Sequence, residues 1–323
     1  MKSTYKCGEG VTGIFDWDTK VMELYSDNGT LDPYWPIEEN DDEEDDDGPG
    51  CYIREEICSV KVNGTIRLPK DSSGIYDHRM FRNMYSLKSI DTKGFDASGV
   101  TDMTGMFTNC HALQTLDLNS WDTSKVKSMQ GMFRECHSLT DIQIRIQTPL
   151  VNDMGSMFNG CHKLTSLDLS SFDTSSVKDM SNMFNCCEAL TELDLNGFDM
   201  SNVRDIRSMF EGCTNLKTLN VDKWNTANIA DMRRTFFQCL NLLDLKINDW
   251  DTSNTVKMAQ MFCHCRTLTS LDIKGFNLSK VEDMSNMFLA CVRLKELSIP
   301  ESIRNETDTH NIFLGCPKNI IIN

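Results

Sequence analysis

The sequence has no long hydrophobic run. In the first 25 residues, charges interrupt every apolar stretch, so the hydrophobic core of a signal peptide is missing. Nowhere else do about 18 apolar residues follow one another, the length that a membrane-spanning helix requires. We therefore predict no secretory leader and no membrane insertion. An intracellular, assembly-associated or virion-associated location is favoured over secretion.

Positive charge is also scarce. The 323 residues hold 32 basic and 48 acidic side chains, for a formal net charge of −16. Residues 1–58 account for most of the excess, with 17 acidic and 4 basic residues, whereas the remaining 265 hold 31 and 28. Proteins that bind nucleic acid usually carry a basic surplus. The composition therefore argues against a nucleic-acid partner.

Motifs of catalysis are missing as well. The sequence contains no glycine-rich phosphate loop, no nucleophile elbow and no paired Cys/His nucleophile. Catalysis needs several unlike residues to converge, and this sequence repeats the same few. We predict a protein that is not an enzyme and that needs no cofactor.

What the sequence does contain is a repeat. Its marker is a phenylalanine, usually after methionine, and seven of the nine intervals between copies are 26 residues and two are 25. The marker residues are Phe81, Phe107, Phe133, Phe158, Phe184, Phe210, Phe236, Phe262, Phe288 and Phe313. A fixed period of this length is typical of solenoids, whose units bury their apolar faces against one another. We predict an α/β repeat solenoid of the leucine-rich-repeat type with about ten coils.

Each coil is predicted to contain four steps. Leu190, Leu193 and Leu195 have the spacing of a short strand, and stacked coils would align such strands into one parallel sheet face. An aromatic residue and an Asp-Thr-Ser turn follow, as at 172–175. A short extended piece then ends near Val177.

The fourth step is predicted to be a short helix. Met180, Met183, Phe184 and Cys187 fall at i, i+3, i+4 and i+7, the spacing of an amphipathic helix. Asp179 is placed to cap its N-terminus. A Met-rich face could also be an adaptable binding surface, but the helical spacing favours core packing.

Fourteen cysteines are present, and nine of them stand three residues after the marker phenylalanine. These are Cys110, Cys136, Cys161, Cys187, Cys213, Cys239, Cys265, Cys291 and Cys316. Side chains in one column of a stack point the same way, which is poor geometry for a disulfide. We predict a column of reduced, buried cysteines that serve as small apolar residues.

The residues before the first coil are predicted to form two segments. Residues 1–58 are an acidic N-terminal segment, partly disordered at 38–50, where nine of the ten residues at 38–47 are acidic. A calcium site is the alternative there, but the spaced pattern of a calcium loop is absent. Residues 59–80 are a cap, with a hairpin about Asn63-Gly64. The solenoid is assigned to 81–323.

The repeat has a distinctive consensus pattern. The pattern V-x-D-M-S-x-M-F-x-x-C-x-x-L-x-x-L-D-L-x-x-F-D-T-S is met by Val177 to Ser201, with Met200 in place of Thr. It resembles the BspA-like class of leucine-rich repeats, the 26-residue variety of mycoplasma and other bacterial proteins and of some protists and viruses. The resemblance covers roughly residues 59–323. It implies a binding or adhesion solenoid and supplies no catalytic residues.

Acidic residues at exposed strand positions are the candidate binding residues. They are Asp91, Asp117, Asp141, Asp168, Glu192, Asp194 and Asp272. One interpretation is an acidic groove for a basic protein partner. The other is a row of ordinary solvated charges, relieved by water, counterions and neighbouring hydroxyl groups.

Histidines suggest a metal site only weakly. His111, His137 and His162 follow the column cysteine in three successive coils and could chelate zinc. The competing interpretation is a variable exposed column, since Glu188 and Thr214 take the same place in later coils. The run Cys263-His264-Cys265 lacks a completing Cys pair. We predict no metal site.

Two functions remain open. The first is a non-enzymatic interaction or adhesion solenoid that binds a partner through its exposed sheet face. The second is a structural component of a larger assembly or virion that docks through the acidic N-terminal segment.

Overall fold

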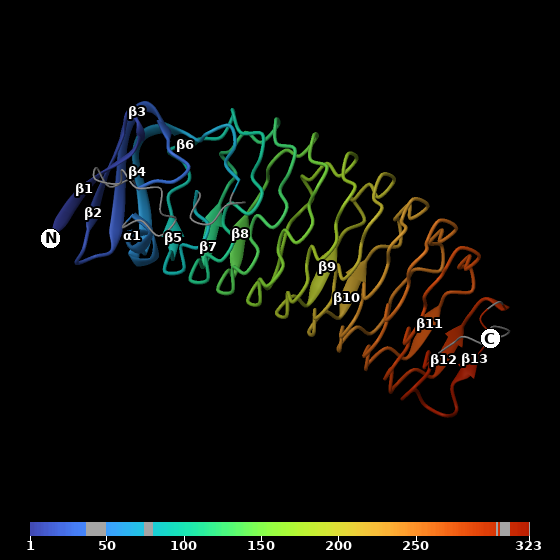
Figure 1. Ribbon diagram of the computed structural model, residues 1–323. Coiled ribbons are helices and arrows are strands. Elements are labelled where there is room, and N and C mark those ends of the chain that lie inside the picture. Colours follow the sequence, from blue (N-terminus) through green and yellow to red (C-terminus); the bar gives the residue numbers. More distant parts are fainter. Residues whose placement is uncertain (37–49, 74–79, 302, 304–310, 323) are drawn as a thin grey trace. The chain divides into compact units, whose positions relative to one another are not determined.

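The computed structural model describes residues 1–36, 50–73, 80–301, 303 and 311–322 (Figure 1). The chain divides into two compact units, Met1–Val151 and Asn152–Asn323. The acidic run at 38–47, and most of the segment predicted to be disordered, lie outside the described residues. Among the residues that are described, no helix is both long enough and apolar enough to cross a membrane.

The first unit begins with a sheet rather than with a coil. Strands β1 (Lys2–Glu9), β2 (Val11–Asp16) and β3 (Val21–Leu31) are antiparallel, and β4 (Ser59–Arg67) runs parallel to β3. β4 then pairs in parallel with β5 (Ser89–Ile90) and β6 (Phe95–Asp96) of the first coil. Figure 1 shows these strands side by side at the N-terminal end. The sheet therefore passes from an antiparallel cap into the parallel ladder of the solenoid.

The predicted hairpin about Asn63-Gly64 is wrong. Residues 59–67 form one continuous strand, and the irregularity lies in the partner strand, where the register shifts between Asp27 and Gly29. Gly64 has φ +98°, and a Cβ at this position would collide with the carbonyl oxygen of Ser26. The glycine thus permits a close approach of two backbones and not a reversal of the chain.

A buried arginine joins the cap to the first coil. Arg54, in helix α1 (Gly50–Glu56), is 2% exposed. Its guanidinium donates to the carbonyl oxygens of Trp35 and Met80, the latter at 2.6 Å. The Trp35 ring packs edge-on against Phe81, with 5.8 Å between ring centroids. The first phenylalanine of the repeat is therefore covered by the cap.

The strands of the coils are only two or three residues long. In the first unit β7 (Thr115–Asp117) pairs in parallel with β8 (Asp141–Gln143). In the second unit β9 (Glu192–Asp194) pairs with β10 (Thr218–Asn220), and β11 (Ser270–Asp272), β12 (Glu296–Ser298) and β13 (Ile321–Ile322) form a separate ladder. The predicted parallel strand face exists in each unit, but in the second unit it is interrupted.

The predicted short helix is wrong. Asn182 and Cys186 have φ values of 56° and 57°, the left-handed region that an α-helix excludes. Alternate backbone N–H groups, those of Met180, Asn182, Phe184 and Cys186, donate to carbonyl oxygens of the next coil at 2.7–3.0 Å. The segment is a series of tight turns, and alternate backbone N–H groups in it are hydrogen-bonded to the next coil. The helical spacing of apolar residues arose because these turns also return side chains to the core every three or four residues.

The aspartates accept hydrogen bonds from backbone N–H groups as predicted, but they do so in turns and not at the start of a helix. Asp179 Oδ1 accepts a hydrogen bond from the backbone N–H of Ser181 at 2.8 Å, and Asp205 and Asp231 make the same bond to Arg207 and Arg233. Each carboxylate therefore closes a turn instead of a helix terminus.

Stacked phenylalanine rings fill the core of each unit. In the first unit Phe81, Phe107 and Phe133 stack at 5.1 and 5.7 Å between centroids. In the second unit consecutive rings from Phe158 to Phe313 stack at 5.4–5.8 Å. The column cysteines are buried as predicted, apart from Cys316, which is half-buried.

Candidate functional site: the exposed strand face

Each coil presents two side chains outward, on either side of an inward leucine or isoleucine. In β9, for example, Glu192 and Asp194 are exposed while Leu193 is buried. The predicted residues Asp91, Asp117, Asp141, Asp168, Glu192, Asp194 and Asp272 are all exposed. Asp91, Asp117 and Asp141 belong to the first unit and the other four to the second. The structure thus distributes them along two strand faces and does not gather them at one point.

The column that precedes the buried residue alternates between hydroxyl and acidic side chains. In the second unit it reads Ser166, Glu192, Thr218, Asp244, Ser270, Glu296. Stacked strands are about 4.8 Å apart, so the acidic members stand roughly 10 Å from one another. A hydroxyl group between each pair of carboxylates reduces their mutual repulsion. The sequence shows this alternation, but most of the predicted residues belong to the column that follows the leucine, so the prediction left the alternation out.

The column that follows the buried residue has a structural task. Asp194 Oδ1 accepts the backbone N–H of Asn196 at 3.1 Å, and Asp272 Oδ1 accepts that of Lys274 at 3.0 Å. Asp91, Asp117 and Asp168 make the corresponding bond at 3.0–3.2 Å. These aspartates therefore hold the turn after the strand, whatever they bind. Asp141 and Glu192 belong to the other column and do not share this task.

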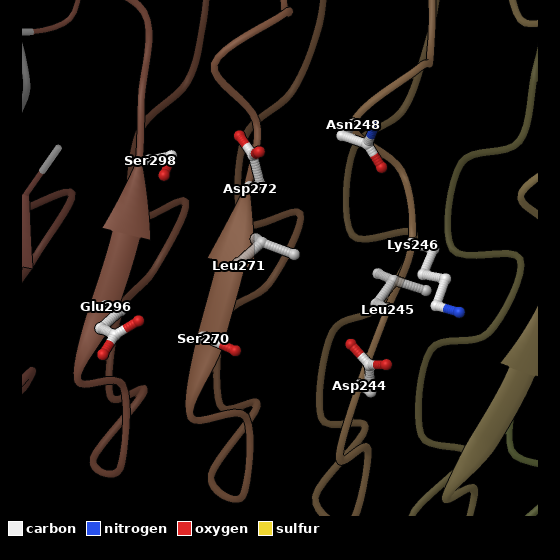
Figure 2. Close-up of a pocket in the computed structure, with 9 residues that line it drawn as sticks. All are labelled: Asp244, Leu245, Lys246, Asn248, Ser270, Leu271, Asp272, Glu296 and Ser298. Carbon is white, nitrogen blue, oxygen red and sulfur yellow. The ribbon is translucent and has the colours of Figure 1, made fainter.

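A cleft of about 260 Å³ opens on the strand face of the second unit. Its lining comprises Asp244, Leu245, Lys246, Asn248, Ser270, Leu271, Asp272, Glu296 and Ser298. Figure 2 shows Glu296, Ser270 and Asp244 in a row across three neighbouring segments, near the end where the strands begin, and the Lys246 side chain extending away from β11. Of the predicted residues, the cleft includes Asp272 alone, and it adds Asp244 and Glu296.

The cleft lies where the parallel ladder is interrupted. Ile273 N donates to Ser298 O at 2.9 Å and Leu195 N donates to Asn220 O at 3.1 Å, which closes the β11–β12 and β9–β10 pairs. Among the described residues, no backbone hydrogen bond joins 244–246 to Ser270–Asp272. Backbone N–H and C=O groups on the two sides of this gap are therefore not paired with one another, and three carboxylates and two hydroxyl groups line the cleft beside them.

The histidines of the first unit stack face to face. The rings of His111 and His137 are 4.4 Å apart between centroids with an interplanar angle of 7°, and Tyr85 packs on His111 at 5.0 Å. Ring nitrogen lone pairs lie in the ring plane, so a face-to-face stack does not direct both rings at one metal ion. Burial, followed by the neighbouring His137, lowers the pKa of His111. His137 Nε2 contacts Glu135 at 2.8 Å.

The remaining metal candidates have other partners. In the second unit His162 Nδ1 lies 3.1 Å from the carbonyl oxygen of Cys186 and 3.3 Å from Glu188 Oε1. Burial raises the pKa of the Cys263 thiol to about 11, which disfavours the thiolate that a metal would need. His264 packs edge-on against Phe237 at 5.9 Å. None of these residues forms a ligand set within one unit.

Comparison with known proteins places the repeats in a family. The family described as "Mycoplasma protein of unknown function, DUF285" matches residues 76–146, 140–220 and 211–320, together about three quarters of the chain. The chain belongs to this family. The resemblance inferred from the repeat pattern is thereby confirmed. No curated protein matches the chain.

Solved structures similar to this family member include three leucine-rich repeat proteins from bacteria. A leucine-rich repeat protein from Eubacterium ventriosum has 14% identity and a TM-score of 0.36, with 99% of this chain and 96% of that one covered. One from Bacteroides ovatus has 16% identity and a TM-score of 0.35, with 99% and 92% covered. A leucine-rich cell surface protein from Faecalibacterium prausnitzii has 13% identity and a TM-score of 0.29, with 99% and 94% covered.

Proposed function

We propose that this chain is a non-enzymatic interaction protein that binds a basic protein partner on the exposed strand face of its second unit. The observation that carries the proposal is the cleft at Asp244, Asp272 and Glu296. It combines carboxylates from three successive coils with backbone groups left open by the gap in the ladder. A lysine or arginine side chain would find both charge and hydrogen-bond acceptors there.

The spacing of the acidic side chains supports an extended partner. Glu192, Asp244 and Glu296 recur every second coil, roughly 10 Å apart by the usual separation of strands. A peptide in the polyproline II conformation rises about 3.1 Å per residue and has three residues per turn. Basic residues at every third position of such a peptide therefore lie on one side of it, about 9 Å apart, and would meet successive carboxylates along the face.

Ordinary solvation is the competing explanation, and a matched pair of variants separates the two. D244S/E296S replaces two cleft carboxylates by the hydroxyl residue that the same column carries at Ser166 and Ser270, so the fold should tolerate it. D222S/E282S removes the same charge from exposed positions outside the cleft. The probe is a peptide with lysine at every third position, titrated by fluorescence anisotropy at about 50 mM salt.

The proposal expects D244S/E296S to weaken probe binding by about tenfold, and D222S/E282S to leave it close to wild type. Equal losses in the two variants would mean that net charge alone attracts the probe, and the site would then be rejected. No binding of the probe to the wild-type chain would reject the basic partner.

Docking through the acidic N-terminal segment is the second proposal. It requires a different test from a simple deletion of the N-terminus, because β1, β2 and β3 lie within the first 31 residues and belong to the cap sheet. Replacing the nine acidic residues of 38–47 by amides keeps those strands. Loss of assembly with this variant, but not with D244S/E296S, would favour the acidic segment.

A further inference from the structure

A second cleft in the second unit is lined by arginines. It has a volume of about 430 Å³ and lies on the turn segments that follow the capping aspartates, not on the strands. Arg207, Arg233 and Arg234 come from two adjacent coils, and Asp283 also lines the cleft. The rest of the lining is Ser208, Ala259, Gln260 and Ser285.

The arginines depart from the repeat. The column of Arg207 and Arg233 holds a small residue in four other coils of this unit, namely Gly155, Ser181, Ala259 and Ser285. The column of Arg234 holds Ser156, Asn182, Ser208, Gln260 and Asn286. Arg234 adopts φ 58°, a left-handed conformation in which asparagine is favoured over arginine. Since the fold is served by Ser and Asn at these positions, the three arginines require another explanation.

Pairing with nearby carboxylates accounts for only part of the arginine cluster. Arg233 is engaged by Asp231, with Nε–Oδ1 and Nη2–Oδ2 distances of 3.0 and 2.5 Å. Arg207 Nη2 remains 3.7 Å from Asp205, beyond hydrogen-bond distance. Arg234 Nη2 contacts Glu211 at 2.7 Å, but its Nε is buried with no hydrogen-bond partner among the described residues. Guanidinium N–H groups of Arg207 and Arg234 can therefore still donate hydrogen bonds to a ligand.

Arg234 is also held in place. Its guanidinium carbon lies 4.2 Å from the centroid of the Phe237 ring, and its side chain is 42% exposed. An arginine fixed on an aromatic face loses less conformational entropy when it binds a carboxylate. The cleft thus has a cation held on an aromatic ring beside the Arg233–Asp231 ion pair.

We propose that the arginine cleft of Arg207, Arg233 and Arg234 binds an acidic peptide. Carboxylates of the peptide accept from the guanidinium N–H groups of Arg207 and Arg234, while Arg233 stays paired with Asp231. This ligand is negatively charged, whereas the partner proposed for the strand face is positively charged. The chain's own run at 38–47, with nine acidic residues in ten, has the chemistry of such a peptide and serves as a probe.

The test uses the full chain with the acidic residues of 38–47 replaced by amides, so that the chain's own run does not compete. A labelled peptide of sequence EENDDEEDDD is titrated by fluorescence anisotropy, beside a neutral control in which Gln and Asn replace the acids. On this background R207S/R234N restores residues that other coils carry at both positions. R266S removes an exposed arginine of the same unit that lies outside the cleft.

We expect R207S/R234N to weaken binding of the acidic peptide by about tenfold and R266S to change it less than twofold. The neutral peptide should not bind. An unchanged affinity in R207S/R234N, or equal binding of the neutral peptide, overturns the proposal. Displacement by inorganic phosphate at constant ionic strength would show a simple oxyanion site and would also overturn the peptide assignment.

Discussion

The thiol of Cys213 donates to the carbonyl oxygen of Phe184 in the preceding coil, with 3.1 Å between sulfur and oxygen. The same contact, at 3.0–3.2 Å, joins Cys110 to Phe81, Cys136 to Phe107, Cys187 to Phe158 and Cys239 to Phe210. Cysteine in this column is therefore both a small buried residue and a donor that ties successive coils together. The recurrence of cysteine, and not alanine, follows from that second property.

Two substitutions at Cys213 separate the effect of the hydrogen-bond donor from that of side-chain volume. C213A removes the thiol donor and reduces the volume, and we expect a loss of about 1–2 kcal/mol in the free energy of unfolding, measured in urea. C213S keeps a donor near Phe184. If donation matters, C213S will be at least as stable as C213A. A clearly less stable C213S would mean that the column is purely apolar packing.

The last cysteine of the column should be the most reactive one. Burial raises the pKa of the Cys110 thiol to about 12, whereas a hydrogen bond from Cys291 lowers the pKa of half-buried Cys316. Because the thiolate is the reactive form, iodoacetamide at about pH 8 should alkylate Cys316 well before Cys291. Mass spectrometry of partially labelled protein measures the order. Alkylation of Cys291 at the same rate would contradict this account.

The coil pattern was predictable from the sequence, and the backbone that connects it was not. Period, phenylalanine core and cysteine burial follow from residue types in fixed columns, so they were correct. The prediction of a helix at Met180–Cys187 failed because tight turns return side chains to the core at intervals that mimic a helix. The left-handed φ values of Asn182 and Cys186 distinguish the turns from a helix. The exposure of the strand-face acids was predicted correctly. The cleft at Asp244 depends on which strand pairs form, and no single column of the repeat encodes that.

Arg54 should be essential to the junction between the cap and the first coil. Its guanidinium satisfies carbonyl oxygens of Trp35, Met80 and Arg82 while itself buried. We expect R54M to lower the free energy of unfolding by about 3 kcal/mol or more, because several buried acceptors lose their donor. R54K should recover only part of this loss, since an ammonium group cannot reach acceptors in a planar fork. Thermal unfolding followed by circular dichroism measures both variants.

Two aspartates of the second unit should respond oppositely to pH. Burial raises the pKa of Asp205, so its contribution to stability is present at low pH and is lost as the pH rises through the folded-state pKa. D205N should therefore gain stability relative to wild type between about pH 3 and pH 7. The Asn side chain keeps an oxygen for the Arg207 N–H, so the turn is preserved.

Asp251 is the matched control for this pH dependence. Hydrogen bonds from the Ser253 hydroxyl and backbone N–H lower its pKa, so its contribution is present at neutral pH and is lost as the pH falls through the folded-state pKa. D251N should lose stability relative to wild type over the same rise in pH. Parallel trends for D205N and D251N would contradict the assignment of either shift.

Hydrogen–deuterium exchange with the basic probe peptide tests the central claim most directly, because it locates the bound peptide on the chain. We predict slower exchange in segments containing 244–248, 270–274 and 296–298, where the ladder is open and the carboxylates of Asp244 and Glu296 stand. Segments of the arginine cleft at 207–208 and 233–234 should be unchanged. Protection confined to segments outside the strand face, with 244–248 and 270–274 exchanging as in the free protein, would contradict the account.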